Sequence, residues 1–97
     1  MKKITLLTLL LFCNSTFSQV TGRITDTKQN PLSFVSVYLD KTFTGTTSNE
    51  NGYYELDIKK PGDYVIVFQF LGYKIVKKPV SIDDFPFQVN VVLEDEK

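Results

Sequence analysis

The feature that most constrains this chain is a succession of short β-prone segments, each closed by a turn signal, within only 97 residues. After residue 18, no stretch keeps apolar residues at positions i, i+3, i+4 and i+7 for three helical turns, so no helix is predicted there. Apolar and polar side chains alternate instead with a period of two, as they do in half-buried strands. The expected strands cover residues 20–25, 34–39, 42–47, 53–58, 64–71, 73–82 and 87–93.

Three local patterns predict how these strands are arranged. Residues 64–71 are almost continuously apolar, which is typical of a central strand covered on both sides. Lys77-Lys78-Pro79 places two charges and a missing N–H group on one strand, as expected at an exposed sheet edge. Asn51-Gly52 is the strongest turn signal, because both residues accept the positive φ angles of a tight hairpin turn.

Six or seven strands without crossover helices predict an all-β, antiparallel fold, either a sandwich or a small barrel. The sandwich is favoured because two of the expected strands carry lysine and proline suited to exposed edges. Two sheets would bury their valine, leucine and phenylalanine faces against each other. A chain of this length allows one such domain.

The first 18 residues are predicted to be a secretory signal peptide. Lys2 and Lys3 precede a short apolar run over residues 4–12, and small or polar residues follow as far as Ser18. The apolar run is too short to span a bilayer, which needs about 20 apolar residues. We therefore expect cleavage after Ser18 and export of the remaining chain. The alternative is a buried N-terminal strand or helix.

Cys13 is the only cysteine of the chain. Lipidation of Cys13 is an alternative to simple cleavage, since Leu10 stands three residues before it, but the bulky Phe12 occupies a position where lipoprotein signals have a small residue. Without residues 1–18 no cysteine remains, and no disulfide supports the domain.

The composition excludes several kinds of active site. The chain has no histidine and a formal net charge of zero, so the usual nucleophilic triads, the usual zinc, copper and iron sites, and a basic surface for nucleic acid are not expected. The five glycines are scattered at turns and form no phosphate loop. Asp26 with residues 49–51 could supply oxygen ligands to Ca²⁺, but the spaced ladder of a calcium loop is missing. No catalytic residue, cofactor or metal site is predicted.

Recognition is the remaining chemistry that the residues offer. Phe43, Tyr53 and Tyr73 stand beside glycines at expected strand ends, where an exposed ring stacks on a sugar. Lys77 and Lys78 form a small basic pair that suits a glycan or an anionic lipid. These five residues are the predicted interaction surface. The alternatives are packing of the rings in the core or in turns, and solvation of the lysines at a sheet edge.

Five short segments, taken in order and with their spacing, carry a family resemblance. The segments are VTGRITD at 20–26, PL followed by VSV within 31–37, GTTSNENGYY at 45–54, PGDY at 61–64 and FLGY at 70–73. Together they resemble the carboxypeptidase regulatory-like domain, and the resemblance covers residues 19–93. One departure is Asn49, which stands where that family commonly has aspartate.

The resemblance implies a seven-stranded, transthyretin-like (prealbumin-like or Ig-like) β-sandwich over residues 19–93, followed by an acidic tail at 94–97. Such domains are accessory modules without catalytic residues. In many Gram-negative bacteria they follow a signal peptide at the N-terminus of TonB-dependent receptors and related outer-membrane proteins. The resemblance therefore implies location in the periplasm or on the periplasmic side of the outer membrane, with membrane association only through a separate barrel domain.

The functional prediction is a non-catalytic interaction module of the bacterial cell envelope with a protein partner. The alternative is a small secreted domain that binds a glycan or another ligand. A hydrolase has no support beyond the association of such domains with carboxypeptidases. Whether Lys97 ends a free-standing protein or the front domain of a longer one stays open.

Overall fold

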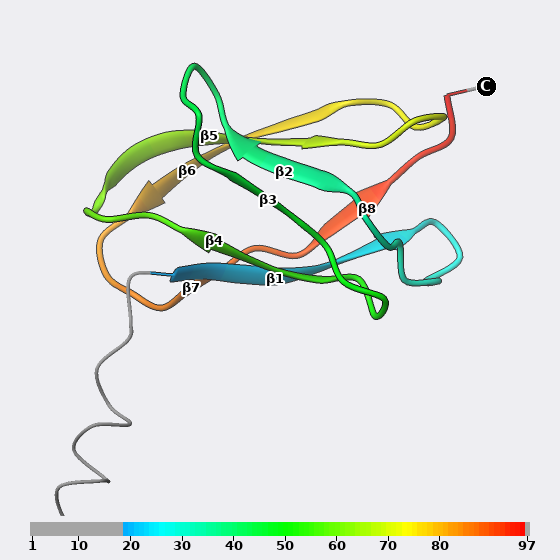
Figure 1. Ribbon diagram of the computed structural model, residues 1–97, viewed down its shortest axis with the longest axis horizontal. Coiled ribbons are helices and arrows are strands. Elements are labelled where there is room, and N and C mark those ends of the chain that lie inside the picture. Colours follow the sequence, from blue (N-terminus) through cyan, green and yellow to red (C-terminus); the bar gives the residue numbers. More distant parts are fainter. Residues whose placement is uncertain (1–18, 97) are drawn as a thin grey trace, which may run out of the picture.

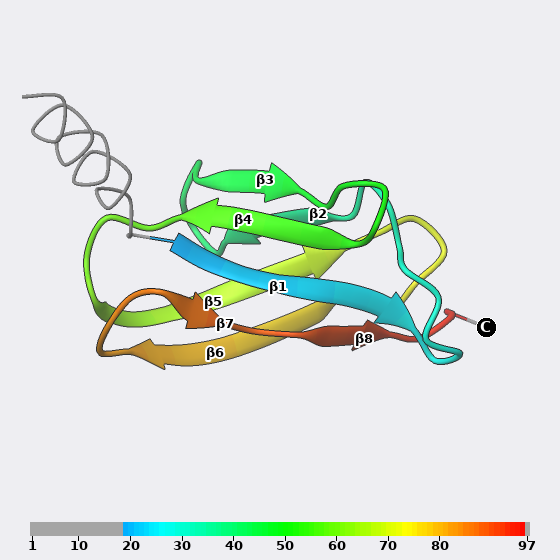
Figure 2. The same ribbon diagram turned by 90° about the horizontal axis from the view of Figure 1, so that it is seen from below.

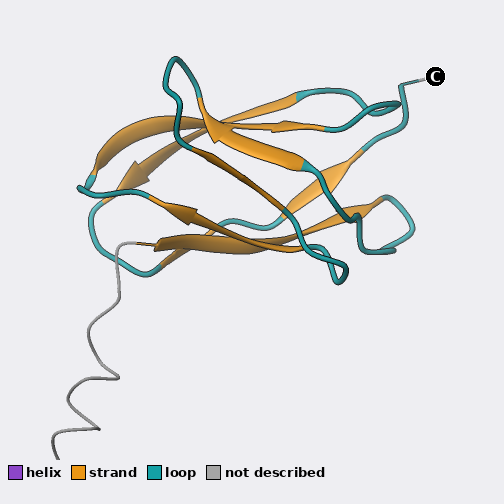
Figure 3. Cartoon of the chain, in the orientation of Figure 1, coloured by secondary structure: helices purple, strands orange, loops and turns teal. Residues whose placement is uncertain are grey.

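The computed structural model describes residues 19–96, which form eight β-strands in two facing sheets (Figure 1). Only strands, loops and turns occur among these residues (Figure 3), and none of them forms a helix long and apolar enough to cross a membrane. The expected all-β sandwich is therefore confirmed. The strands are β1 (Gln19–Asp26), β2 (Ser36–Leu39), β3 (Gly45–Thr47), β4 (Tyr53–Asp57), β5 (Gly62–Gln69), β6 (Val76–Ile82), β7 (Phe87–Gln88) and β8 (Val91–Leu93).

The two sheets have different pairing patterns. In the first sheet β1 lies in the centre, with β4 antiparallel on one side and β7 and β8 parallel on the other (Figure 2). The second sheet has the order β3-β2-β5-β6, and all its pairs are antiparallel. The predicted edge position of Lys77-Lys78-Pro79 is confirmed, because β6 ends this sheet.

The core lies between the sheets and follows the predicted alternation. The inward side chains are fully or almost fully buried; they include Val20, Ile24, Val35, Val37, Leu39, Tyr54, Leu56, Ile58, Ile66, Phe68, Ile82, Val91 and Leu93. The predicted central position of this strand is confirmed, because β5 lies between β2 and β6. The expected cover on both sides is not, because only its inner face packs against the other sheet. Val67 of β5 is also fully buried, although it is on the outer face. Tyr38 and Lys77 stand opposite Val67 on the two neighbouring strands, where their long side chains shield it from water.

A close junction attaches the C-terminal segment to β1. The Val89 N–H donates to the Thr21 carbonyl (2.8 Å), and the buried Tyr54 hydroxyl donates to the Val89 carbonyl (2.7 Å). The backbone of Gly22 lies so near that a Cβ atom there would stand 1.7 Å from the Val89 oxygen. The Tyr54 ring also packs edge-on against Phe68 of the other sheet, with centroids 5.6 Å apart. Only glycine at position 22 permits this approach.

The same junction corrects two expectations. Residues 87–93 are not one strand, because the Val89 carbonyl bonds the Tyr54 side chain and the Asn90 side-chain oxygen accepts the Arg23 N–H (2.9 Å). These two side-chain bonds interrupt the ladder and divide the segment into β7 and β8, which makes eight strands instead of seven. The sandwich is also not wholly antiparallel, since β7 and β8 run parallel to β1.

The predicted hairpin at Asn51-Gly52 is wrong in its pairing. A tight turn does form, with the Gly52 N–H donating to the Asn49 carbonyl (2.9 Å). However, β3 and β4 on its two sides belong to different sheets, so the turn is a corner between layers. Gly52 has φ of +81°, whereas Asn51 is not among the residues with positive φ. The Asn49 side chain replaces the second positive-φ residue by accepting the N–H groups of Asn51 (2.9 Å) and Tyr53 (3.0 Å).

The pairing extends beyond Leu93, where the domain is expected to end and an acidic tail to begin. The Lys74 N–H donates to the Glu94 carbonyl (2.9 Å), and the Glu96 N–H donates to the Gly72 carbonyl (3.0 Å). These bonds fasten the last described residues to the β5–β6 turn. The expected signal peptide, its cleavage after Ser18 and the lipidation of Cys13 lie outside the described residues.

Gly22→Ala tests the junction. The added methyl group would force the Val89 backbone away from β1, so we expect a loss of about 3 kcal/mol in the free energy of unfolding. Urea denaturation measures it. Gly45→Ala is the matched control, because its Cβ would stand 3.1 Å from its nearest neighbour, the Tyr38 Cβ, and should cost less than about 1 kcal/mol. Equal midpoints for the two variants would contradict the close approach.

The burial of Tyr54 predicts a loss of stability at high pH. Burial raises the pKa of the Tyr54 hydroxyl well above its ordinary value, so the folded chain keeps the proton that the unfolded chain releases near pH 10. Stability is therefore full below about pH 10 and falls as the pH rises further. Tyr54→Phe should weaken this dependence and cost about 1–3 kcal/mol at neutral pH, because the Val89 carbonyl loses its partner. Parallel pH dependences of the urea midpoint in both proteins would contradict the assignment.

A candidate interaction groove

An open groove of about 570 Å³ lies on the outer face of the β3-β2-β5-β6 sheet. It is at the end of the sandwich where the β5–β6 turn and the C-terminal residues meet (Figure 1). We call it the outer-face groove and define it by Phe34, Ser36, Tyr38, residues 69–73, Ile75 and Glu96.

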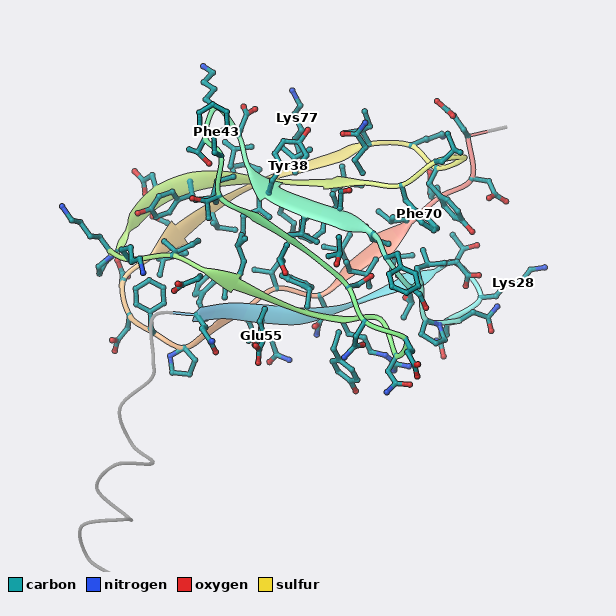
Figure 4. The ribbon with its side chains drawn as sticks, viewed as in Figure 1. Lys28, Tyr38, Phe43, Glu55, Phe70 and Lys77 are labelled. Carbon is teal, nitrogen blue, oxygen red and sulfur yellow. The ribbon has the colours of Figure 1, made fainter. Side chains whose placement is uncertain are left out.

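The floor of the groove follows from strand alternation. Val35, Val37 and Leu39 point into the core, so Ser36 and Tyr38 point outward. Figure 4 shows Tyr38 and Lys77 rising from this face, with Glu55 on the opposite side of the molecule. Ser36 stands opposite Gln69 in the β2–β5 register, and the Tyr38 hydroxyl donates to the Gln69 side-chain oxygen (3.1 Å).

The β5–β6 turn supplies the apolar wall. The rings of Phe70 and Tyr73 stack with centroids 5.5 Å apart and planes at 28°, and the Tyr73 N–H donates to the Phe70 carbonyl (3.0 Å). Leu71 at the tip of the turn is 96% exposed, and Ile75 is 54% exposed. Large apolar side chains gathered at one exposed place are typical of recognition surfaces.

Phe34 completes the groove from a strained position. Its backbone has φ of +62°, a conformation that costs a residue with a bulky side chain about 1–3 kcal/mol, and its ring is 70% exposed. The buried Ser48 holds this conformation from both sides. Its hydroxyl donates to the Leu32 carbonyl (2.7 Å) and accepts the Val35 N–H (2.9 Å), while its carbonyl accepts the Phe34 N–H (3.0 Å). The fold thus holds the Phe34 backbone in a strained conformation that exposes its aromatic ring to solvent.

Two charged groups near the groove have side-chain or backbone partners. Among residues 19–96, Glu96 is the only charged residue that lines the groove, and the nearby Lys74 pairs with Glu94 at 3.4 Å. Asp26 is the last residue of β1, directly before the turn that leads to β2. The Asp26 carboxylate accepts hydrogen bonds from the Asn30 N–H, the Asn30 side chain and the Lys28 N–H. These bonds lower the pKa of Asp26, and the bond from the Asn30 N–H has the largest effect.

The groove therefore offers apolar contact and a few hydrogen bonds. Over residues 19–96 no group of three or more His, Cys, Asp or Glu side chains is placed to hold a metal ion. The lowered pKa of Asp26 also keeps that carboxylate ionised, which is the opposite of what a general acid needs at neutral pH.

The predicted interaction residues do not form one surface. Tyr73 lies in the groove, whereas Phe43 is fully exposed in the β2–β3 loop at the other end of the sandwich (Figure 4). Tyr53 is half exposed at the start of β4, with the Arg23 guanidinium 5.4 Å from its ring centroid. Lys77 and Lys78 are exposed on the edge strand β6. Whether any of the five binds a partner stays a prediction.

The sequence contained part of the signal for the groove residues that were not predicted. The alternation around Val35 and Val37 places Phe34 and Tyr38 on the outward face, and two rings on a solvent-facing strand surface mark a recognition site. Leu71 was expected to end the central strand, but it lies in the turn beyond β5 and is exposed. The positive φ of Phe34 has no sequence signal, since it depends on Ser48.

Residues 20–97 match the sequence model of the CarboxypepD_reg-like domain. The chain belongs to this family. A curated relative is the TonB-dependent receptor SusC of Bacteroides thetaiotaomicron, which is 35% identical over 77 residues. The match covers 79% of this chain but only 7% of the receptor, so it concerns a small part of that protein.

Solved structures of low sequence identity share the fold of this family member. Two are interface mutants of a type II cohesin–X-dockerin complex from Acetivibrio cellulolyticus. They match with TM-scores of 0.58 and 0.56 at 15% and 14% identity, over 80% and 78% of this chain and 58% and 56% of theirs. A third is 3-chlorocatechol 1,2-dioxygenase from Rhodococcus opacus 1CP, with a TM-score of 0.58 at 9% identity over 84% of this chain and 62% of that chain. At these identities the similarity concerns the fold alone.

Two substitutions at Phe34 separate backbone strain from the ring. Phe34→Ala removes the ring but keeps a Cβ atom at positive φ, whereas Phe34→Gly removes both. We expect the glycine variant to be more stable than the alanine variant by about 1 kcal/mol, measured by urea denaturation. Both should stay near the parent, because the ring is mostly exposed. Equal stabilities of the two variants would show that Phe34 stores no strain.

Proposed function

We propose that this chain is a non-catalytic accessory module of the bacterial cell envelope that binds a protein partner through the outer-face groove. We further propose that it is exported behind a signal peptide and serves as the N-terminal domain of a TonB-dependent outer-membrane transporter. The observation that carries the proposal is the family match over residues 20–97, together with a relative that is itself a TonB-dependent receptor.

The groove supports recognition as the role of the module. Phe34, Leu71 and Ile75 expose apolar surface at one place, and truncating such anchors is what costs most at protein interfaces. The strained backbone of Phe34 favours the same interpretation, because strain of this kind is found where function needs a fixed side chain. Catalysis has no comparable support among residues 19–96, where no aspartate or glutamate is fully buried and no three of them are grouped to hold a metal ion.

A second candidate is glycan binding, favoured by the stacked rings of Phe70 and Tyr73 beside the polar side chains of Ser36 and Gln69. Sugars present apolar faces to aromatic rings and hydroxyl groups to polar neighbours. In this case the occupant of the groove would be a carbohydrate, and the module would work as a small ligand-binding domain.

Site-specific photo-crosslinking in living cells tests where the partner binds. A photoreactive amino acid at Leu71 should give a discrete protein adduct in the envelope fraction, because Leu71 projects from the groove wall. The matched control is the same amino acid at the exposed Glu55, on the opposite outer face (Figure 4). Equal adducts at both positions would contradict the groove as the interface. Glycan-array binding that Leu71→Ser abolishes, without any protein adduct, would favour the second candidate.

Export is tested separately with alkaline phosphatase fused behind residue 97. The parent fusion should be active outside the cytoplasm, and interrupting the apolar run with Leu9→Asp and Leu10→Asp should abolish that activity. Reading the gene beyond Lys97 tests the transporter assignment. A continuing frame with amphipathic strands of about ten residues supports it, and a stop codon at that point contradicts it.

A further inference from the structure

The corner turn between β3 and β4 holds a chemically reactive dipeptide. The Asn51 side chain is exposed, and the residue that follows it is Gly52. An asparagine side chain is attacked most readily by the backbone nitrogen of a following glycine, because glycine has no side chain to obstruct the approach. The folded chain therefore places an intrinsically labile asparagine on its surface.

The reaction is a self-contained exchange of an amide for a carboxylate. The Gly52 nitrogen loses its proton to solvent base and attacks the Asn51 Cγ atom. A nitrogen–carbon bond forms, the bond from Cγ to the side-chain nitrogen breaks, and ammonia leaves with the proton returned from solvent. Water then adds to either carbonyl of the five-membered succinimide, the bond from that carbonyl carbon to the Gly52 nitrogen breaks and the nitrogen regains a proton, which gives aspartate or isoaspartate. Nothing is oxidised or reduced, and the co-reactant is water.

The closed turn restrains the attacking atom. The Gly52 N–H donates to the Asn49 carbonyl (2.9 Å), and the Gly52 carbonyl accepts the Ile24 N–H (2.8 Å). Gly52 is buried, and a Cβ there would stand 2.6 Å from the Ile24 oxygen, so the residue has no room to swing toward Asn51. Asn51 is held as well, since its own N–H donates to the Asn49 side-chain oxygen (2.9 Å).

We propose that Asn51 is a self-deamidation site that the closed corner turn suppresses and that opening of the turn releases. The reaction then proceeds at a rate set by the population of the open turn. The modification site is independent of the partner that occupies the outer-face groove, because it lies on the β3–β4 corner and contributes nothing to the groove lining.

The isoaspartate product prevents the turn from closing again. Its backbone passes through the former side chain and is one carbon longer, so Gly52 no longer reaches both Asn49 and Ile24. The former Asn51 carbonyl, which accepts the Arg23 Nε–H at 3.3 Å, becomes a free carboxylate. The Arg23 guanidinium lies over the Tyr53 ring in the unmodified chain. The new carboxylate would attract the guanidinium in competition with that ring. Deamidation at Asn51 is thus a one-way change of the corner.

Comparing the folded and the unfolded chain tests the proposal without any substitution. The full chain is incubated at mildly alkaline pH in buffer and in a denaturing concentration of urea, and deamidation is followed by mass spectrometry of the tryptic peptide spanning residues 42–59. We expect the reaction at Asn51 to be about tenfold or more slower in buffer. Equal rates in the two solutions would overturn the protective role of the turn, and absence of reaction in urea would overturn the site itself.

Variants then identify the restraint. Asn49→Ala removes the side-chain oxygen that holds Asn51 and Tyr53 and should raise the rate in buffer several-fold. Tyr38→Phe is the control, since it removes a hydrogen bond to Gln69 on the outer face of the second sheet and leaves the hydrogen bonds of the corner turn intact. Asn51→Gln should abolish the signal. A rate in Asn49→Ala equal to that of Tyr38→Phe, at matched folded fractions, would show that the Asn49 side chain does not close the turn.

Discussion

The junction of Gly22, Val89 and Tyr54 is the constraint on which the rest of this structure depends. It fastens the C-terminal segment to the central strand of the first sheet, and the Tyr54 ring reaches across to Phe68 in the second. The buried Tyr54 side chain therefore joins three segments of the chain, through its hydroxyl to Val89 and through its ring to Phe68. No buried side-chain nitrogen or oxygen among residues 19–96 lacks a hydrogen-bond partner, so the interior holds these layers without unmet polar groups.

The closed interior determines where recognition takes place. With both inner faces packed, three of the six large hydrophobic side chains that stay exposed among residues 19–96 lie together at one end of the second sheet, where Phe34, Leu71 and Ile75 line the groove. The same end receives the last described residues, which pair with the β5–β6 turn. A partner bound in the groove would therefore also contact the last described residues, among them Glu96.

Periodicity predicted the parts of the fold that depend on local burial. The inward faces around Val35 and Tyr54 follow the predicted alternation, because burial repeats every second residue in a strand. Phe68 lies in the segment that was predicted to be a central strand from its almost continuous apolar character. The division of residues 87–93 into β7 and β8 was not predictable, since it rests on side-chain bonds from Tyr54 and Asn90 to distant backbone atoms. Of the groove, Tyr73 was predicted. The strained conformation of Phe34, another residue of the groove, was not predicted. It depends on hydrogen bonds from Ser48, which lies beyond the end of β3 and leaves no signal in the sequence around Phe34.

The most direct test of this account is native-state hydrogen exchange of the Val89 amide, followed by NMR. If the C-terminal segment closes the sandwich over Gly22, this amide is bonded to Thr21 and should exchange as slowly as that of Phe68 in the centre of the core, by global unfolding only. Exchange as fast as that of the fully exposed Phe43 would contradict the account, because β7 and β8 would then be a loosely attached tail rather than part of the first sheet.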